Sequence, residues 1–193
     1  MDMPDYTQWF RDYAAAYERS LGERVDSAAI RACFAEGFVA ASLQGPVQAG
    51  VNDEAFERTL QAAYGFYRAI GTRSMSVERV EVAPICPNHD RVRVFYRAGY
   101  RKPDGSPLTI RFDVVYLLQR RGEGPKIYAF IAGDEMALYR QHGLVDDAGQ
   151  PLPPVRDEAA GRLARDQAGS TFAPRSSSSA RSSERWQRDS SSQ

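Results

Sequence analysis

Two aspartates are the residues in this sequence best placed for acid-base chemistry. Asp113 is the only carboxylate inside a run of alternating apolar residues, and Asp134 directly follows an apolar run. A carboxylate in an apolar cavity can remove a proton from carbon while hydroxyl groups stabilise the resulting oxyanion. Structural roles compete with this chemistry. We expect Asp113 to pair with Arg93, Arg97 or Arg111 on the same face of a sheet, and Asp134 to cap a helix.

Aromatic residues on the apolar faces of predicted elements are the candidates for lining a pocket. These residues are Tyr17, Phe34, Phe38, Tyr64, Tyr67, Tyr96 and Tyr116. Their rings would surround a small apolar or aromatic ligand, and one or two hydroxyl groups could point into the pocket. For each single tyrosine the favoured alternative is a core residue whose hydroxyl is satisfied by a neighbour.

Metal and cofactor chemistry has little support in the sequence. Cys86 and His89 are spaced like half of a metal site, but no second pair stands at a matching distance. A nucleophilic role for this pair would also need an orienting residue and an oxyanion hole. The sequence contains no phosphate-binding loop and no dinucleotide fingerprint. We therefore predict no metal and no cofactor.

Three amphipathic helices are predicted ahead of the strands. The first covers residues 6–21, where apolar residues recur at steps of three and four after a capping residue, Asp5. The second begins at residue 26 or 27, and its apolar side is formed by Ile30, Cys33, Phe34 and Phe38. The third is capped by Asn52 and ends at Gly71.

The apolar period changes to two from Met75 onward, which is typical of β-strands. Strands are predicted at residues 75–82, 92–101, 109–118 and 127–132. In the third strand Phe112 and Tyr116 share the face expected toward the helices, whereas Val115 and Leu117 lie on the other. A short helix follows Asp134 and is closed by Gly143.

Composition divides the 193 residues into one domain, residues 5–145, and a Pro-, Ser- and Arg-rich tail, residues 146–193, that is predicted to be disordered. The sequence has 25 basic and 25 acidic residues, so no overall field attracts nucleic acid or anionic lipid. It has no apolar run of membrane-spanning length and no signal-peptide pattern at its start. A cytoplasmic protein that binds neither membrane nor nucleic acid is the expectation.

The order of the predicted elements resembles that of the nuclear transport factor 2-like superfamily: two helices, a short hairpin, a long helix and then long antiparallel strands. This superfamily includes ketosteroid isomerases and SnoaL-like cyclases. Three segments carry the local resemblance to a bacterial branch: residues 33–38 (CFAEGF), Gly45-Pro46 leading to Asn52-Asp53, and residues 131–135 (IAGDE). The resemblance implies an α+β fold in which a cone-shaped, curved antiparallel sheet packs on three N-terminal helices. It does not choose a reaction, because this fold carries several activities.

Three functions follow as hypotheses. The first is a small-molecule-binding domain with an apolar pocket, forming a homodimer through the outer sheet face. Val115, Leu117, Tyr128 and Phe130 are expected on that face. The second is a cyclase, lyase or isomerase with Asp113 or Asp134 as its base. The third is a dimerisation module whose cavity is filled by side chains.

Overall fold

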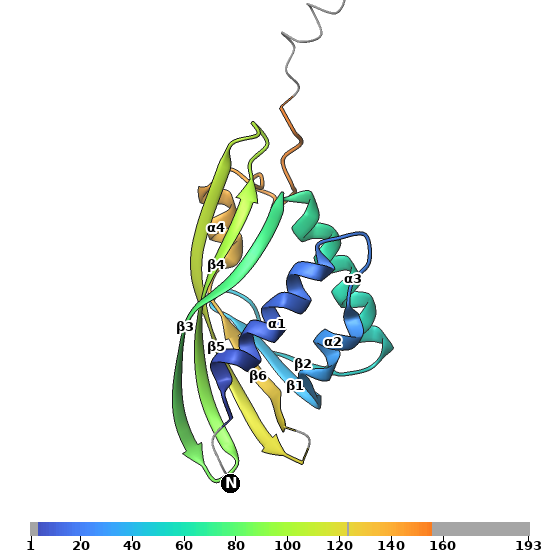
Figure 1. Ribbon diagram of the computed structural model, residues 1–193. Coiled ribbons are helices and arrows are strands. Elements are labelled where there is room, and N and C mark those ends of the chain that lie inside the picture. The colour runs from blue at the N-terminus through green and yellow to red at the C-terminus, as the bar shows by residue number, and fades with distance from the viewer. Residues whose placement is uncertain (1–3, 123, 156–193) are drawn as a thin grey trace, which may run out of the picture. The chain divides into compact units, whose positions relative to one another are not determined.

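The computed structural model of the chain describes residues 4–122 and 124–155. Three helices lie on one side of a curved, open, six-stranded sheet, and a short fourth helix follows the last strand (Figure 1). The helices are α1 (Tyr6–Ser20), α2 (Ser27–Ala32), α3 (Glu54–Ala69) and α4 (Glu135–Gln141). The strands are β1 (Phe34–Ser42), β2 (Gln48–Val51), β3 (Thr72–Cys86), β4 (His89–Arg101), β5 (Pro107–Arg121) and β6 (Gly124–Ala132). The predicted α+β class is confirmed.

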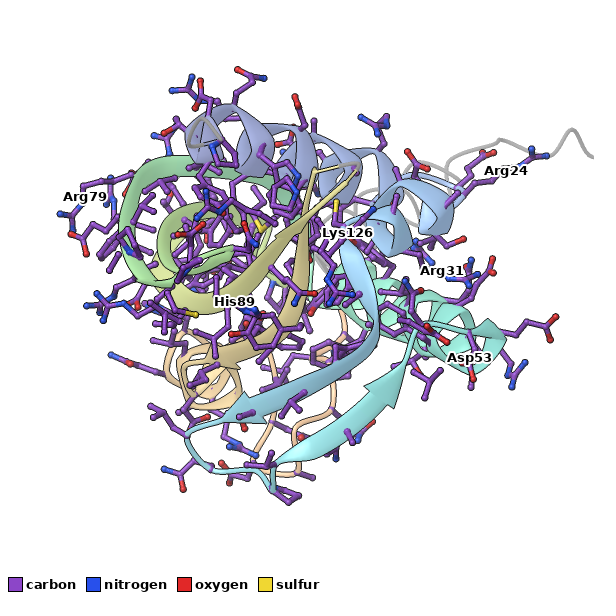
Figure 2. All side chains as sticks on the ribbon, turned by 90° about the horizontal axis from the view of Figure 1, so that it is seen from below. Arg24, Arg31, Asp53, Arg79, His89 and Lys126 are labelled. Atoms are coloured by element: carbon purple, nitrogen blue, oxygen red, sulfur yellow. The ribbon has the colours of Figure 1, made fainter. Side chains whose placement is uncertain are left out.

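The sheet has the strand order β2-β1-β6-β5-β4-β3 and one parallel pair. All neighbours are antiparallel, as the predicted antiparallel sheet requires, except β1 and β6, whose parallel pairing the sequence did not indicate. Two contacts fix β6 beside the start of β1: Ile127 N donates to Cys33 O at 2.8 Å, and Lys126 Nζ donates to Ala32 O at 2.6 Å (Figure 2). A parallel pair needs a long connection, which α3 and four strands provide here.

Helix α2 ends earlier than its apolar pattern predicts. It stops at Ala32, and Phe34 and Phe38 belong to strand β1. Residues four apart lie on one face of a helix and also on one face of a strand, so the spacing of these two rings fits both structures. The ladder with β6 decides the outcome.

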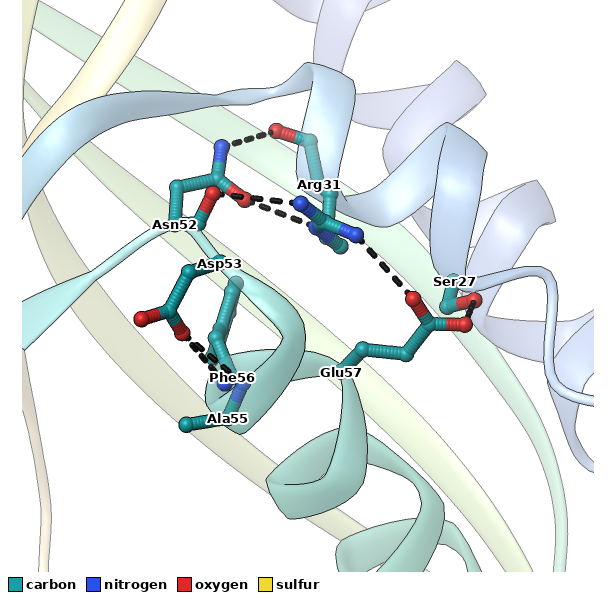
Figure 3. A network of polar contacts seen from close by, with 7 residues as sticks. All are labelled: Ser27, Arg31, Asn52, Asp53, Ala55, Phe56 and Glu57. Carbon is teal, nitrogen blue, oxygen red and sulfur yellow. Dashed lines mark hydrogen bonds and ion pairs between the residues drawn. The ribbon is translucent and has the colours of Figure 1, made fainter.

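Polar contacts tie α2 to the first turn of α3 (Figure 3). The Arg31 guanidinium donates to Asn52 Oδ1 at 3.0 Å and to Glu57 Oε2 at 3.0 Å, while Ser27 Oγ donates to Glu57 Oε1 at 2.8 Å. Asn52 is therefore not the cap that the sequence predicts. Asp53 caps α3 instead, accepting bonds from the backbone N–H groups of residues 55 and 56. The network holds the start of α3 against α2.

A bulge between β5 and β6 changes which side chains face outward. The register shifts between Leu117 and Leu118, so Ile127 and Phe130 both face the helices. Tyr128 instead packs on His89, with ring centroids 5.5 Å apart. Phe130 was predicted on the outer face, and that placement is wrong because a bulge inserts one residue and reverses the alternation. The inward placement of Phe112 and Tyr116 on β5 is confirmed.

The chain remains attached to the domain beyond the predicted boundary at residue 145. Val145 pairs with Pro151, Leu152 N donates to Leu144 O at 3.1 Å, and Val155 N donates to Pro103 O at 2.8 Å. A proline-containing segment can form such contacts without any apolar period, since the residues next to its prolines, here Leu152 and Val155, keep their N–H groups as donors. The boundary therefore moves to at least residue 155. The rest of the predicted disordered tail, residues 156–193, lies outside the described residues.

Candidate functional site

An internal cavity of about 190 Å³ lies between the helices and the sheet. Aromatic rings from α1, α3, β1, β4, β5, β6 and α4 form most of its wall. Six of the seven predicted pocket residues line it: Tyr17, Phe34, Tyr64, Tyr67, Tyr96 and Tyr116. The wall also contains Tyr13, Tyr100 and Tyr139, which were not predicted from the sequence. The apolar faces of separate elements thus converge on one hollow.

Phe38 is the predicted pocket residue that lies outside this wall. It pairs with Gly50 across β1 and β2, and a Cβ atom at Gly50 would come within 2.5 Å of the Phe38 ring. The ring therefore covers the glycine, a cross-strand arrangement that a side chain at position 50 would prevent. Phe38 also packs against Phe34 and Phe56, so it supports the cavity wall from behind.

Two buried phenol groups face each other across β4 and β5. The hydroxyl oxygens of Tyr96 and Tyr116 are 3.1 Å apart, and burial raises the pKa of both groups above the ordinary tyrosine value. Both therefore stay neutral at physiological pH. One hydroxyl donates to the other, which leaves the proton of the second free to donate to an oxygen atom in the cavity.

Among the described residues that line the cavity, Glu135 is the only acidic one. It is the first residue of α4, and Tyr139 Oη donates to its Oε2 at 3.1 Å. Burial raises the pKa of its carboxyl group, against a smaller lowering by the Tyr139 hydrogen bond. Within residues 4–122 and 124–155 no salt bridge engages Glu135. A desolvated carboxyl group without a cationic partner keeps its proton to higher pH than an exposed one, so it is a candidate for exchanging a proton with a bound molecule.

Glu135 was not predicted from the sequence, because its neighbour Asp134 has the stronger local signal. Asp134 and Glu135 both follow an apolar strand, and only one of them can cap the helix. The signal that could have identified Glu135 is its spacing from Tyr139, since residues four apart on a helix lie on one face.

The two predicted catalytic aspartates lie elsewhere. Asp113 is on the outer face of the sheet, where its Oδ2 pairs with Arg93 Nε at 2.7 Å and its side chain is 33% exposed. Asp134 Oδ1 accepts a bond from Ala137 N at 2.9 Å and caps α4. Both aspartates thus have the structural roles that the sequence favours, and neither lines the internal cavity.

Asp90, the second residue of β4, is another acidic group that is buried. It is fully buried, with Tyr6 Oη donating to its Oδ2 at 2.6 Å and Arg120 Nε 2.9 Å from the same oxygen. Burial and the hydrogen bond to Asp90 raise the pKa of Tyr6. This cluster joins the start of α1 to β4 and β5 and does not border the cavity. Its role is structural.

The remaining sequence expectations concern metals and membranes. Cys86 and His89 are partners in the β3–β4 ladder, and the part of the chain that the structure describes contains no cluster of three or more His, Cys, Asp or Glu residues arranged to hold a metal. None of the helices in that part is long and apolar enough to cross a membrane.

Comparison with known structures shows what the fold is similar to. Aln2 from a Streptomyces species is 17% identical, with a TM-score of 0.55 over 73% of this chain and 99% of its own. An NTF2-like protein with a cystatin-like fold from Novosphingobium aromaticivorans is 12% identical, with a TM-score of 0.51 over 71% of this chain and 85% of its own. A ketosteroid isomerase-like protein from Erwinia carotovora atroseptica is 17% identical, with a TM-score of 0.46 over 63% and 87%.

Comparison at the sequence level gives the family. The search of curated proteins finds no match. A family model described as NTF2-like protein (DUF6841) matches residues 4–135, which include α1 to α3, the six strands and Glu135. The chain therefore belongs to this family of NTF2-like proteins.

Proposed function

We propose that the cavity binds a small, mainly apolar or aromatic molecule with a carbonyl or hydroxyl group, and that Glu135 exchanges a proton with it. The observation that carries this proposal is the carboxyl group of Glu135 within a wall of aromatic rings, bonded to Tyr139 and without a cationic partner. Removing a carboxyl group from water is costly, so a desolvated one in the wall of a cavity is a candidate functional group. Binding without turnover is the alternative, and the aromatic wall alone supports it.

The lining groups support a proton-transfer reaction next to a carbonyl group. Glu135 would take a proton from carbon and return it to another atom, which is the step shared by isomerisations, dehydrations and cyclisations. The free hydroxyl proton of the Tyr96 and Tyr116 pair would donate to the oxygen on which negative charge develops. Both phenols remain neutral because burial raises the pKa of each, so they act as donors and not as bases.

Replacing Glu135 with glutamine should stabilise the protein at neutral pH. A raised carboxyl pKa means that the folded state binds the proton more tightly, so stability falls as pH rises from the ordinary value of 4.5 through the folded pKa. Glu135→Gln removes this fall. Denaturation curves should show the variant more stable than the wild type at about pH 7 and nearly equal to it at about pH 4. Asp113→Asn, on the opposite face, is the control and should bring no such gain.

The same variants test binding, with 4-ethylphenol as the probe. The melting temperature of the wild type should rise with probe concentration. The rise should grow with pH as Glu135 ionises, because a carboxylate accepts a stronger hydrogen bond from the phenol. Glu135→Gln should lose this pH dependence and Asp113→Asn should keep it. Absence of any melting shift, together with identical stability profiles for wild type and Glu135→Gln, would contradict the proposal.

We also propose that a second copy of the chain covers the outer sheet face. Ladder pairs place Leu117 beside Ala129 and Val115 beside Ile131, so their apolar side chains are contiguous. Ile131 is 48% exposed and Val39, which pairs with Ala129, is 38% exposed. An apolar patch that spans neighbouring strands is typical of an interface between protein subunits, and a two-fold axis would bury the patch of both copies together.

Leu117→Arg should convert the dimer to a folded monomer. The arginine would place two like charges near the axis and leave them without water. Size-exclusion chromatography with light scattering measures the change. Thr109→Arg is the matched control, since it adds the same charge to the same face of β5 at the opposite end of the strand. A wild type that is monomeric at micromolar concentrations, or a Leu117→Arg variant that remains dimeric, would contradict the proposed interface.

A further inference from the structure

A second hollow adjoins the internal cavity. It is an open groove of about 690 Å³ between the end of β1 with the loop after it, α3 and the start of α4. Six residues line both spaces: Ala63, Tyr67, Phe130, Ala132, Glu135 and Tyr139. Glu135 therefore stands where the aromatic-lined cavity meets the more open groove. This position also explains why the residue is partly exposed although its carboxyl group is desolvated.

The two spaces differ in the side chains that surround them. Large rings enclose the internal cavity, whereas small and amide side chains form much of the groove wall. Examples on the groove side are Ala40, Ser42, Gln44, Gly45, Gln48 and Ala62. Rings favour flat, compact groups by stacking and edge contacts. A wide groove with small side chains accommodates a flexible chain.

The volumes indicate that the internal cavity holds only part of the ligand. A cavity of about 150 Å³ accommodates benzene, so 190 Å³ gives room for a ring group of slightly larger size. Pockets for whole small-molecule ligands generally have volumes of about 300 to 1,000 Å³. The groove, at about 690 Å³, supplies the missing space.

The charges narrow the ligand class further. Asp134 and Glu135 are the charged residues that line the two spaces, and no lysine, arginine or histidine within the described ranges joins them. A carboxylate or phosphate group on the ligand would meet two acidic residues and no basic partner. The site therefore disfavours anionic ligands.

We propose that the ligand is an uncharged, elongated molecule with a compact ring in the internal cavity and a flexible chain in the groove. This inference rests on the proposed function, since it assumes that the cavity binds the reacting part of the molecule.

Three probes and three variants test the inference in the full-length chain by calorimetric titration. We expect 4-hexylphenol to bind about tenfold or more tightly than 4-ethylphenol, because its longer chain removes more methylene groups from water. The anionic 4-hexylbenzoate should bind more weakly than 4-hexylphenol by about tenfold or more. Ala62→Trp fills the groove from α3. It should bring the affinity for 4-hexylphenol down to that for 4-ethylphenol and leave the affinity for 4-ethylphenol unchanged.

Two further variants make the result decisive. Gln48→Trp fills the groove from β2, on the opposite wall, so the test does not depend on one variant folding. Gln61→Trp adds the same ring to an exposed position of α3 that borders neither space and should behave as the wild type. The elongated ligand is refuted if 4-ethylphenol binds but 4-hexylphenol binds no more tightly. It is also refuted if 4-hexylphenol keeps its higher affinity in both groove variants. In either case the proposed function stands. If neither phenol binds, both proposals fail.

Discussion

Replacing Asp90 with alanine should lower the free energy of unfolding by about 3 to 5 kcal/mol. The carboxyl group is fully buried and holds two partners, Tyr6 Oη at 2.6 Å and Arg120 Nε at 2.9 Å. Its removal leaves the Arg120 guanidinium, whose side chain is only 16% exposed, without a counter-charge. Urea denaturation at neutral pH measures the loss.

Three comparisons separate this explanation from a general effect of mutation. Arg120→Met combined with Asp90→Ala should cost less than the sum of the two single changes, because the double variant no longer buries an unpaired charge. Tyr6→Phe removes one hydrogen bond to a charged group and should cost about 1.5 to 3 kcal/mol. Asp113→Ala breaks an exposed ion pair and should cost at most about 1 kcal/mol. A loss below about 1 kcal/mol for Asp90→Ala would show that the cluster does not stabilise the fold.

The helices and strands could be predicted because their residues alternate with a clear period. The stripe of α1 and the inward faces of β4 and β5 are single repeating patterns, and Asp5 and Asp134 cap α1 and α4 as their positions predict. The prediction failed where pairing partners decide the conformation. The boundary between α2 and β1 depends on the ladder with β6, and the reversal at Tyr128 depends on a bulge opposite Leu117. Neither partner is visible in the local sequence.

The aromatic wall of the site could be predicted, but its acidic group could not. An aromatic residue on an apolar face turns inward wherever that face packs, so Tyr64, Tyr67 and Tyr116 were identified from their own elements. An acidic residue gives no such signal. Asp113 pairs with an arginine and Glu135 lines a cavity, and this difference in surroundings comes from the three-dimensional structure. Phe38 was misplaced for a related reason, since Gly50 leaves the space that its ring fills.

Phe10→Ala should lower the free energy of unfolding by about 3 to 5 kcal/mol. The ring is fully buried on α1, and its centroid lies 4.7 Å from Trp9 and 4.8 Å from Tyr116. Tyr116 lines the internal cavity, so the space that the variant creates lies directly behind the cavity wall. Close-packed neighbours relax only partly around a deleted ring, and the loss therefore includes a cavity term.

The control for this variant is Phe95→Ala on the outer sheet face. Phe95 is partly exposed and lies under the Arg79 guanidinium, whose Cζ atom is 3.9 Å from the ring centroid. The same deletion there removes less apolar surface from water and should cost less than half as much, as thermal and urea denaturation can measure. Benzene should raise the melting temperature of Phe10→Ala more than that of the wild type, since an apolar void next to the cavity binds it. Equal stabilities for the two variants would mean that α1 does not seal the cavity as the packing of Phe10 on Tyr116 implies.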